Sequence, residues 1–147
     1  MIRKAEGKDL QKIESLLSEF YHTEGFQTLN IPYDRDSVLD LALRMIIGEN
    51  GLILVNEKDD RIGGVIGVQM MPFPFNKNYI SLVESFWYAN DGSGIRLLKA
   101  VEKIAIDIGV RFIGIVSIYG MKSEKIERVL CRMKYNKLED HFIKEFE

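Results

Sequence analysis

Apolar residues recur along the chain with two periods, and each change of period marks the border of a predicted element. Spacings of three and four residues predict amphipathic helices, whereas short runs of β-branched and aromatic residues predict strands. Glycine, proline and charged clusters mark the turns between them. The predicted strands are 2–5, 51–55, 62–71, 79–88, 111–118 and 138–146, and the predicted helices are 10–21, 38–46, 95–108 and 126–133.

Some of the predicted borders depend on particular residues. Asp34 or Asp36 is suited to cap the second helix, because short acidic side chains accept hydrogen bonds from the first free amides of a helix. The charged segment 57–61 predicts the turn of a hairpin, and Pro72 and Pro74 are expected to interrupt the next strand. The resulting order, β-α-α-β-β-β-α-β-α-β, predicts a mixed α/β fold.

Length and composition fit one ordinary globular domain that spans residues 1–147. The chain has 147 residues, of which 46% are hydrophobic and 29% charged, and only 3 are prolines. Two domains would leave each half near the size at which a core becomes hard to build, and the composition differs from that of disordered or fibrous proteins. No repeat or low-complexity segment divides the sequence.

Net charge, apolar runs and cysteine content limit the classes of binding partner and the cellular compartment that we expect for this protein. The formal net charge of -2 gives no overall attraction to nucleic acid or to an anionic membrane. No apolar run approaches the roughly 18 residues that span a bilayer, and the charges that follow Met1 oppose a signal peptide. The single cysteine, Cys131, can form neither an intramolecular disulfide nor a cysteine-rich zinc site. We therefore expect a cytoplasmic protein without nucleic-acid or membrane partners.

The most informative segment is a strand, a glycine-rich turn and a helix in direct succession. Strand 79–88 leads into Asp-Gly-Ser-Gly at 91–94, and helix 95–108 follows. The first turn of a helix has backbone N–H groups without partners and partial positive charge, so it can bind an anion, and Arg96 adds a formal charge. The alternative is that the glycines open the helix for steric reasons alone. The sequence has neither a P-loop nor the dinucleotide-binding glycine motif.

The order of elements and the residues around this turn resemble the GNAT superfamily of acetyl-CoA-dependent N-acyltransferases. The resemblance rests on Glu84-Ser-Phe-Trp-Tyr88, on Gly92-Ser-Gly-Ile-Arg-Leu-Leu98, on strand 111–118 and on the final helix-strand unit. The aromatic strand and the glycine turn look most like the small members found in bacteriophages and prophages. The resemblance implies a mixed, mostly antiparallel α/β sheet with splayed fourth and fifth strands and helices on both faces. It also implies transfer of an acyl group from acetyl-CoA to a primary amine by direct attack on the thioester.

The resemblance also implies which residues bind acetyl-CoA. Aligned with the family loop Gln/Arg-x-x-Gly-x-Gly/Ala, Gly92 and Gly94 occupy the two small positions, where backbone N–H groups would bind the CoA pyrophosphate. The preceding strand would pair through its backbone with the pantetheine arm, in the gap where it splays from strand 111–118. The residues implied in acetyl-CoA binding are Phe86, Trp87, Tyr88, Gly92, Ser93, Gly94, Ile95 and Arg96.

Glu84 is similar in position to the acidic residue that acts as the base in several family members. It stands in a strand whose apolar residues include Leu82, Val83, Phe86 and Trp87. Burial would raise its pKa toward the range in which a base works at neutral pH. The alternative is that Glu84 is a solvated or hydrogen-bonded strand residue without a catalytic role.

Two departures from the family pattern leave the proton donor open. Leu130 occupies the place of the family's tyrosine acid, and Ala89 that of the leading Gln/Arg. Tyr119, at the end of strand 111–118, or Tyr88 could supply the proton instead, or the CoA thiol could leave unaided. The alternative function is a module that binds acyl-CoA or a protein partner without turnover. A scaffold without a ligand, in which side chains fill the gap, is a third interpretation.

The remaining candidates favour structural roles. His22 and His141 are far apart in the sequence, so no metal site is expected. Cys131 lies beside an apolar helix face and is expected to fill the core. The run Met70-Met-Pro-Phe-Pro-Phe75 could line an acceptor pocket, form a dimer contact or fold over the core. The sequence does not specify whether the acceptor amine belongs to a small molecule or a protein, and a homodimer is a candidate assembly.

Overall fold

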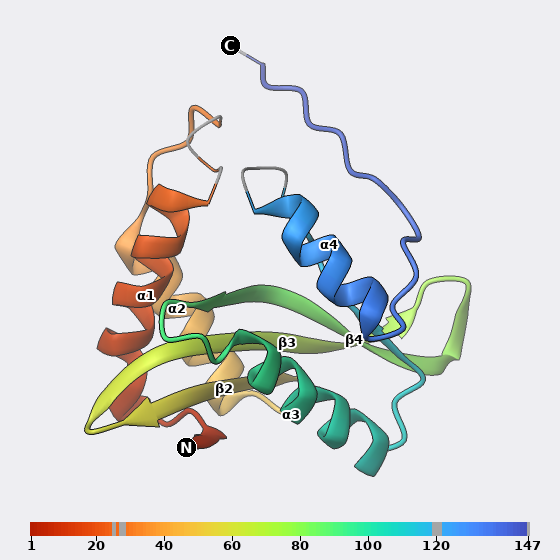
Figure 1. Cartoon of the computed structure of the whole chain (residues 1–147), viewed down its shortest axis with the longest axis horizontal. Helices are drawn as coiled ribbons and strands as arrows, with labels where there is room; N and C mark the ends of the chain where they lie inside the picture. The colour runs from red at the N-terminus through yellow and green to blue at the C-terminus, as the bar shows by residue number, and fades with distance from the viewer. Residues whose placement is uncertain (25, 27–28, 119–121, 147) are drawn as a thin grey trace.

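One sheet with helices on both of its faces organises the protein (Figure 1). The computed structural model describes residues 1–24, 26, 29–118 and 122–146. The strands in this part of the chain are β1 (Ile2–Lys4), β2 (Gly51–Lys58), β3 (Arg61–Phe73), β4 (Asn76–Ala89) and β5 (Phe112–Gly114). The helices are α1 (Leu10–Thr23), α2 (Arg35–Ile47), α3 (Gly94–Asp107) and α4 (Ser123–Arg132), and a short 3-10 helix, Gly7–Asp9, precedes α1.

The sheet has the strand order β1-β2-β3-β4-β5 and is antiparallel from β1 to β4. β4 and β5 run parallel, and they pair only from Ser81↔Phe112 to Val83↔Gly114. By contrast, β3 and β4 pair along almost their whole length. The predicted mixed, mostly antiparallel sheet is therefore confirmed.

Alternation along the strands divides the apolar residues between two cores. On one face of the sheet Val55 and Val65 pack against α1 and α2, and on the other face Leu54 and Ile66 pack against α3 and α4. The helices contribute apolar stripes at the predicted spacing. These stripes contain Ile13, Leu16, Leu17, Ala42 and Met45 on the first side and Leu97, Leu98, Val101, Ala105 and Leu130 on the second.

The hairpins extend the strands beyond their predicted ends. β2 continues to Lys58 because Asp59 and Asp60 form a tight turn with positive φ values of 50° and 59°. Pro72 lies inside β3 opposite Ile80, at a register shift, so the prediction that this proline interrupts the strand is wrong. A register irregularity accommodates a residue that cannot donate a ladder hydrogen bond.

Other predicted borders agree with the structure. The Asp34 carboxylate accepts the backbone N–H of Ser37 at 2.9 Å, so Asp34 caps α2 as one of the two predicted candidates. Pro74 follows the last residue of β3 and lies in the β3–β4 turn, as predicted for a proline that ends a strand. Gly109, with a φ of 73°, follows α3 and provides the left-handed conformation that ends many helices.

The two strands predicted nearest the C-terminus differ from the structure. Strand 111–118 is paired only over β5, and residues 115–118 leave the ladder. Residues 138–146, predicted as a terminal strand, follow α4 on an irregular, exposed path and pair with no described strand. A strand needs a neighbouring edge for its hydrogen bonds, and apolar composition alone does not supply one.

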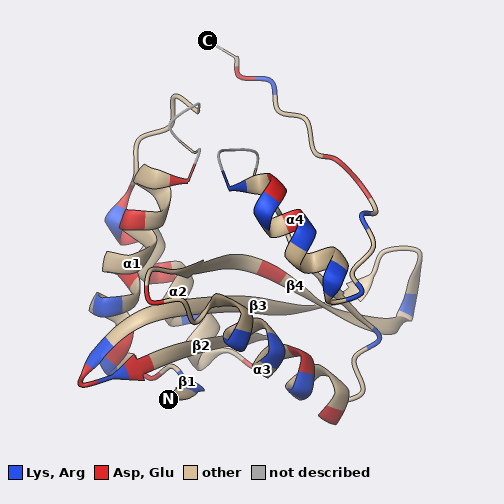
Figure 2. Cartoon of the chain, in the orientation of Figure 1, with Lys and Arg blue, Asp and Glu red and all other residues tan. Residues whose placement is uncertain are grey.

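Charged residues of both signs lie on the outer sides of the helices. Figure 2 shows them interspersed along α1, α3 and α4, in keeping with the net charge of -2. Among the described residues, no helix is both long and apolar enough to cross a bilayer.

Candidate functional site

β4 and β5 separate immediately after their short pairing, and the separation opens the free edge of β4. Their last pair is Val83↔Gly114, and no backbone hydrogen bond between described residues joins the two segments beyond it. The register between β3 and β4 shifts there, so Ser85 has no partner on β3. Such a bulge bends the strand and increases its twist, which turns β4 away from β5.

Glu84 lies at the point of separation and reaches across the gap. Its Oε2 accepts the backbone N–H of Val116 at 3.0 Å, so a side chain joins the strands where the backbone ladder has ended. Burial raises the pKa of this carboxyl to about 7, and the hydrogen bond from Val116 opposes that shift. A carboxyl that titrates near neutral pH is suited to accept a proton during a reaction.

The start of α3 provides the free backbone donors at the other end of this edge. The helical ladder begins with the N–H of Leu97, which donates to the Ser93 carbonyl at 2.9 Å. The N–H groups of Gly94, Ile95 and Arg96 have no acceptor among the residues that the structure describes. Because these amides carry the positive end of the helix dipole, they are suited to bind an anion.

Ser93 differs from its three neighbours because its donors are already used. It is fully buried, and its backbone N–H donates to Oδ1 of Asp91 at 2.9 Å. Its hydroxyl bonds the same carboxylate oxygen. The predicted row of free amides at 92–96 is therefore interrupted at Ser93, and this residue fixes the turn instead of facing a ligand.

A hydrogen-bond network holds the turn that precedes α3. Oδ2 of Asp91 accepts the amide of the buried Asn56 of β2 at 2.7 Å, and Asn90 donates its N–H to Gly63 of β3 at 2.9 Å. Gly92 has a φ of 76°, which favours glycine at this position. These contacts attach the turn to two strands, so the free amides that follow it have a defined place.

Two consecutive glycines in β3 make room for this turn. A Cβ at Gly63 would lie 2.6 Å from the Asp91 side chain, and a Cβ at Gly64 would lie 2.1 Å from Oγ of Ser93. Sequence reasoning missed Asn56, Asp91 and this glycine pair. The signal for the pair was present, since glycine inside a strand often marks the close approach of another segment.

Asp91 also brings a negative charge to the start of α3. Burial opposes its ionisation, but hydrogen bonds from Ser93 and Asn56 lower the pKa of this carboxyl, which is therefore ionised at neutral pH. Part of the helix dipole is thus already balanced, and an anion at residues 94–96 meets a carboxylate nearby. The exposed Arg96 supplies a positive charge at the same turn. The donors and this charge fit a diphosphate group.

The aromatic residues predicted to lie along the cofactor anchor β4 with their side chains. Phe86 is buried against α1 and α2. Trp87 packs on the α3 face, where its indole N–H donates to the Gly94 carbonyl at 3.0 Å, and the Tyr88 hydroxyl donates to Glu19 at 2.8 Å. Because these three side chains contact other parts of the protein, only the backbone groups of this part of β4 are left to bind a ligand. Because Asn90 donates toward β3, alternation directs the backbone groups of Trp87 and Ala89 toward the gap.

The candidates for the proton donor differ in their surroundings. Tyr119 lies outside the described residues. Burial and the hydrogen bond to Glu19 raise the pKa of Tyr88, whose hydroxyl is directed toward α1. Leu130, at the position of the family tyrosine, is buried against α3 and serves as a core residue.

The remaining sequence candidates are the two histidines and Cys131. Nδ1 of His22 is 2.7 Å from the Ser18 carbonyl, whereas Nε2 of His141 is 3.2 Å from Glu139. Among the described residues no group of three or more His, Cys, Asp or Glu side chains could hold a metal ion. Cys131 is exposed, so the prediction that it fills the core is wrong, because the buried position of this helical turn belongs to its neighbour Leu130.

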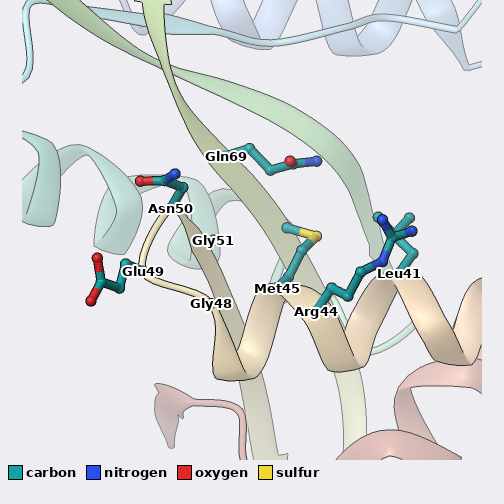
Figure 3. Close-up of a pocket in the computed structure, with 8 residues that line it drawn as sticks. All are labelled: Leu41, Arg44, Met45, Gly48, Glu49, Asn50, Gly51 and Gln69. Atoms are coloured by element: carbon teal, nitrogen blue, oxygen red, sulfur yellow. The ribbon is translucent and has the colours of Figure 1, made fainter.

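A cavity of about 170 Å³ lies at the end of α2 (Figure 3). It is lined by Leu41, Arg44, Met45, Gly48, Glu49, Asn50, Gly51 and Gln69. The amide of Gln69 also donates to the hydroxyl of Ser85, the bulge residue, at 2.8 Å. Neither the predicted site residues nor the amides of residues 94–96 line this cavity.

Comparison with known proteins extends the description of the fold. No protein-family model and no curated protein matches the chain. A predicted acetyltransferase with acetyl-CoA from Clostridium acetobutylicum is similar in structure, with 15% identity, a TM-score of 0.77, and coverage of 99% of this chain and 95% of that chain. An aminoglycoside acetyltransferase from an uncultured soil metagenomic sample, in complex with sisomicin, has 14% identity, a TM-score of 0.70, and coverage of 100% and 96%.

A third similar structure is that of a transcriptional regulator from Bacillus halodurans C-125, with 14% identity, a TM-score of 0.77, and coverage of 99% of each chain. At these identities the likeness concerns the fold. The chain therefore has the fold of the GNAT acetyltransferases, as its sequence predicted.

Proposed function

We propose that the protein binds acetyl-CoA and transfers its acyl group to a primary amine. The observations that carry this proposal are the edge of β4 left unpaired beyond its last pair with β5 and the N–H groups of residues 94–96, which have no acceptor among the described residues. An anionic group bound by these amides places the rest of an extended molecule along the free edge of β4. Acetyl-CoA combines a diphosphate with a long arm rich in amides, and a strand edge can pair with such an arm.

Each part of the site then has a defined task. The N–H groups of residues 94–96 and the side chain of Arg96 hold the diphosphate. The backbone of Trp87 and Ala89 pairs with the pantetheine arm. This arrangement brings the thioester toward the β4 bulge, where Glu84 lies.

The proposed reaction needs one proton acceptor and one leaving group. The amine nitrogen forms a bond to the thioester carbon, the carbon–sulfur bond breaks, and CoA leaves as a thiolate. Glu84 takes the proton lost by the amine, directly or through a water molecule, because its pKa of about 7 leaves a large ionised fraction at neutral pH. Tyr119 and Tyr88 stay the sequence candidates for protonating the thiolate.

The acceptor is proposed to be an amine of a small molecule, with a protein amine as the other choice. The similar acetyltransferase in complex with sisomicin binds an amine-bearing small molecule. The cytoplasmic location, the lack of nucleic-acid partners and the likeness to small phage and prophage members stay predictions from the sequence.

A second candidate function is acyl-CoA binding without turnover. The burial of Leu130 favours it, because the position of the family's tyrosine acid faces the core and carries no donor. One of the similar structures is that of a transcriptional regulator, so the fold is also found in a protein named for a role other than acyl transfer.

Calorimetric titration with acetyl-CoA tests the shared part of both candidates, and release of free thiol over a panel of small amines separates them. We expect binding, turnover, and a decrease in turnover of about 100-fold in Glu84→Gln with binding retained. Glu49→Gln is the matched control, since Glu49 is exposed and lies outside the gap. Binding without turnover by any amine would favour the second candidate. No binding at millimolar acetyl-CoA would contradict both.

A further inference from the structure

Ser117 carries a buried hydroxyl that no described residue binds. Its Oγ is shielded from solvent and has no hydrogen-bond partner among the residues that the structure describes. A buried hydroxyl without a partner has lost its bonds to water and gained none in return, which costs stability. Such atoms are rare in folded proteins, and a catalytic role is one of the reasons for which they are kept.

Ser117 lies at the gap between β4 and β5, on the wall opposite β4. It directly follows Val116, whose backbone N–H donates to Oε2 of Glu84 at 3.0 Å. Because consecutive Cα atoms are about 3.8 Å apart, the Ser117 side chain begins close to the residue that contacts Glu84. The hydroxyl and the carboxyl therefore border the same part of the gap, beyond the last backbone pair of the two strands.

Alternation along this segment places the Ser117 hydroxyl on the face of the sheet that carries α3 and α4. Ile113 and Ile115 pack against the core on that face. Phe112 and Val116, which point the other way, are 48% and 53% exposed. The buried Oγ of Ser117 continues the series of the two isoleucines.

Two other parts of the proposed site lie on this face. Glu84 stands opposite Val68 of β3, which belongs to the same core, and paired residues on neighbouring strands share a face. The free amides of residues 94–96 begin α3, whose Leu97 is part of that core as well. An arm that extends from these amides along the edge of β4 to the bulge therefore brings its end to the side of the gap on which the hydroxyl lies.

We propose that the Ser117 hydroxyl donates a hydrogen bond to the sulfur of CoA while the carbon–sulfur bond of the thioester breaks, an assignment that rests on the proposed function. The sulfur gains negative charge in this step, and a donor that is held in place and shielded from water stabilises such a charge. Leu130 of α4 packs in the same core and carries no donor. The ligand in turn supplies the partner that the buried hydroxyl lacks.

The step balances without the transfer of a proton from Ser117. The amine nitrogen forms its bond to the thioester carbon, and the electron pair of the carbon–sulfur bond goes to sulfur. The surplus proton of the amine goes to Glu84, as in the proposed reaction. Ser117 keeps its own proton and shares it with the thiolate through the hydrogen bond. The task of Ser117 is thus to lower the energy of the leaving thiolate.

The variant Ser117→Ala separates a catalytic role from a structural one. We expect kcat to fall about 10- to 100-fold, the usual value of a hydrogen bond to a charged group, while KM for acetyl-CoA stays within about 2-fold. The melting temperature should stay the same or rise slightly, because the hydroxyl makes no bond to a described residue. Ser117→Thr keeps the hydroxyl and should retain more activity. Ser81→Ala, the control, removes a hydroxyl at the other end of β4 and should leave kcat unchanged.

Calorimetric titration with free CoA at about pH 9 gives a readout that does not depend on turnover. Most of the thiol is then ionised, since the usual pKa of a thiol is about 8.5. Ser117→Ala should weaken CoA binding about 10-fold and change acetyl-CoA binding by less than about 2-fold, because acetyl-CoA carries no charge on sulfur. The neighbouring Glu84, with a pKa of about 7, is ionised in both proteins. A reductant is present because Cys131 is exposed.

Failure of the proposed function and failure of the Ser117 assignment give different results. Absence of acetyl-CoA binding by the natural protein would overturn both. Binding of acetyl-CoA, with equal kcat and equal CoA affinity in the natural protein and in Ser117→Ala, would overturn the assignment alone. A loss of activity that comes with a lower melting temperature and weaker acetyl-CoA binding would give Ser117 a structural role, and it would also overturn the assignment.

Discussion

Two walls border the gap between β4 and β5. The first wall is β4 with the turn that follows it, the second is β5 with the residues that follow it, and the two are held by different kinds of contact. β4 pairs with β3 along almost its whole length, and the turn after it is attached by Asp91 to Asn56 and by Asn90 to Gly63. β5 pairs over three residues, and beyond them the Val116 N–H bonds a side chain, that of Glu84. One wall is thus held by many backbone and buried polar contacts, whereas the other depends on few.

This difference indicates where the site is preorganised and where it can adjust. The amides of residues 94–96 follow the well-held wall, so they should be in place before any ligand binds. Glu84 joins the two walls through the hydrogen bond from Val116, so its protonation bears on this contact as well as on the proposed chemistry. Substitutions in the first wall should therefore cost stability, while those in the second should cost little.

The largest expected effect comes from the protonation of Glu84. Burial raises the pKa of this carboxyl from 4.5 to about 7, so between these values the folded protein binds more protons than the unfolded chain. The free energy of unfolding should therefore fall as pH rises through this window, by up to roughly 3 kcal/mol. Urea unfolding at pH 5 and pH 8 checks this.

Glu84→Gln should remove most of that pH dependence, because a neutral amide does not titrate. Glu49→Gln should retain it. An unchanged slope in Glu84→Gln would show that other groups cause the pH dependence.

The second effect compares one substitution in the two walls. Gly64→Ala should destabilise the fold by about 2 kcal/mol, because its Cβ would lie 2.1 Å from Oγ of the buried Ser93 and 2.9 Å from Leu97. Gly114→Ala in β5 should change stability by less than about 0.5 kcal/mol, because its Cβ would meet its nearest atom at 4.0 Å. Chemical denaturation measures both, and equal losses would contradict the difference between the walls.

A third, smaller effect concerns the hydrogen bond that attaches the turn before α3 to β2. Asn56→Ala removes the donor to Oδ2 of Asp91 and should destabilise the fold by about 1–2 kcal/mol. Because the turn carries the first residues of α3, acetyl-CoA affinity should also fall several-fold. Ser81→Ala, which removes a hydrogen bond of 2.9 Å to the Met71 carbonyl at the other end of β4, is the control for a lost hydrogen bond without a change in affinity. If the two variants bind acetyl-CoA with equal affinity, the attachment of the turn to β2 does not contribute to binding.

The smallest effect is expected at Arg96. Arg96→Gln should leave stability unchanged and weaken acetyl-CoA binding about 5-fold, since an exposed charge near a phosphate contributes little more than about 1 kcal/mol. The loss should shrink as salt is added. Lys99→Gln, one turn further along α3, removes the same charge and should have a weaker effect. A similar loss in both variants would assign the effect to overall charge.

The sequence predicted the well-held wall better than the other. Periodicity placed α1, α3 and the three central strands, because each buries an apolar face that its spacing reveals. Strand ends were predicted too short, since pairing across the hairpins carries β2 to Lys58 and β3 through Pro72. The pattern at residues 138–146 was read as a strand, but a pattern does not show which edge completes the pairing.

The glycine turn predicted a binding role for Gly92 and the first residues of α3, and that role stays a prediction. In the structure the N–H groups of residues 94–96 have no acceptor among the described residues. The use of the Ser93 amide by Asp91 was missed, although an aspartate two residues before a serine often forms such a turn. Asn56 lies on β2, 35 residues from Asp91 in the chain, and no local pattern connects the two.

The free amides at the start of α3 are proposed to bind the diphosphate of acetyl-CoA, and the NMR shifts of those amides report on this claim residue by residue. Titration of the ¹⁵N-labelled protein with acetyl-CoA should shift the amides of Gly94, Ile95 and Arg96 most strongly, followed by those of Trp87 and Ala89. Ser93, whose amide already donates to Asp91, should shift less. Saturation of binding with these amides unmoved would contradict the claim.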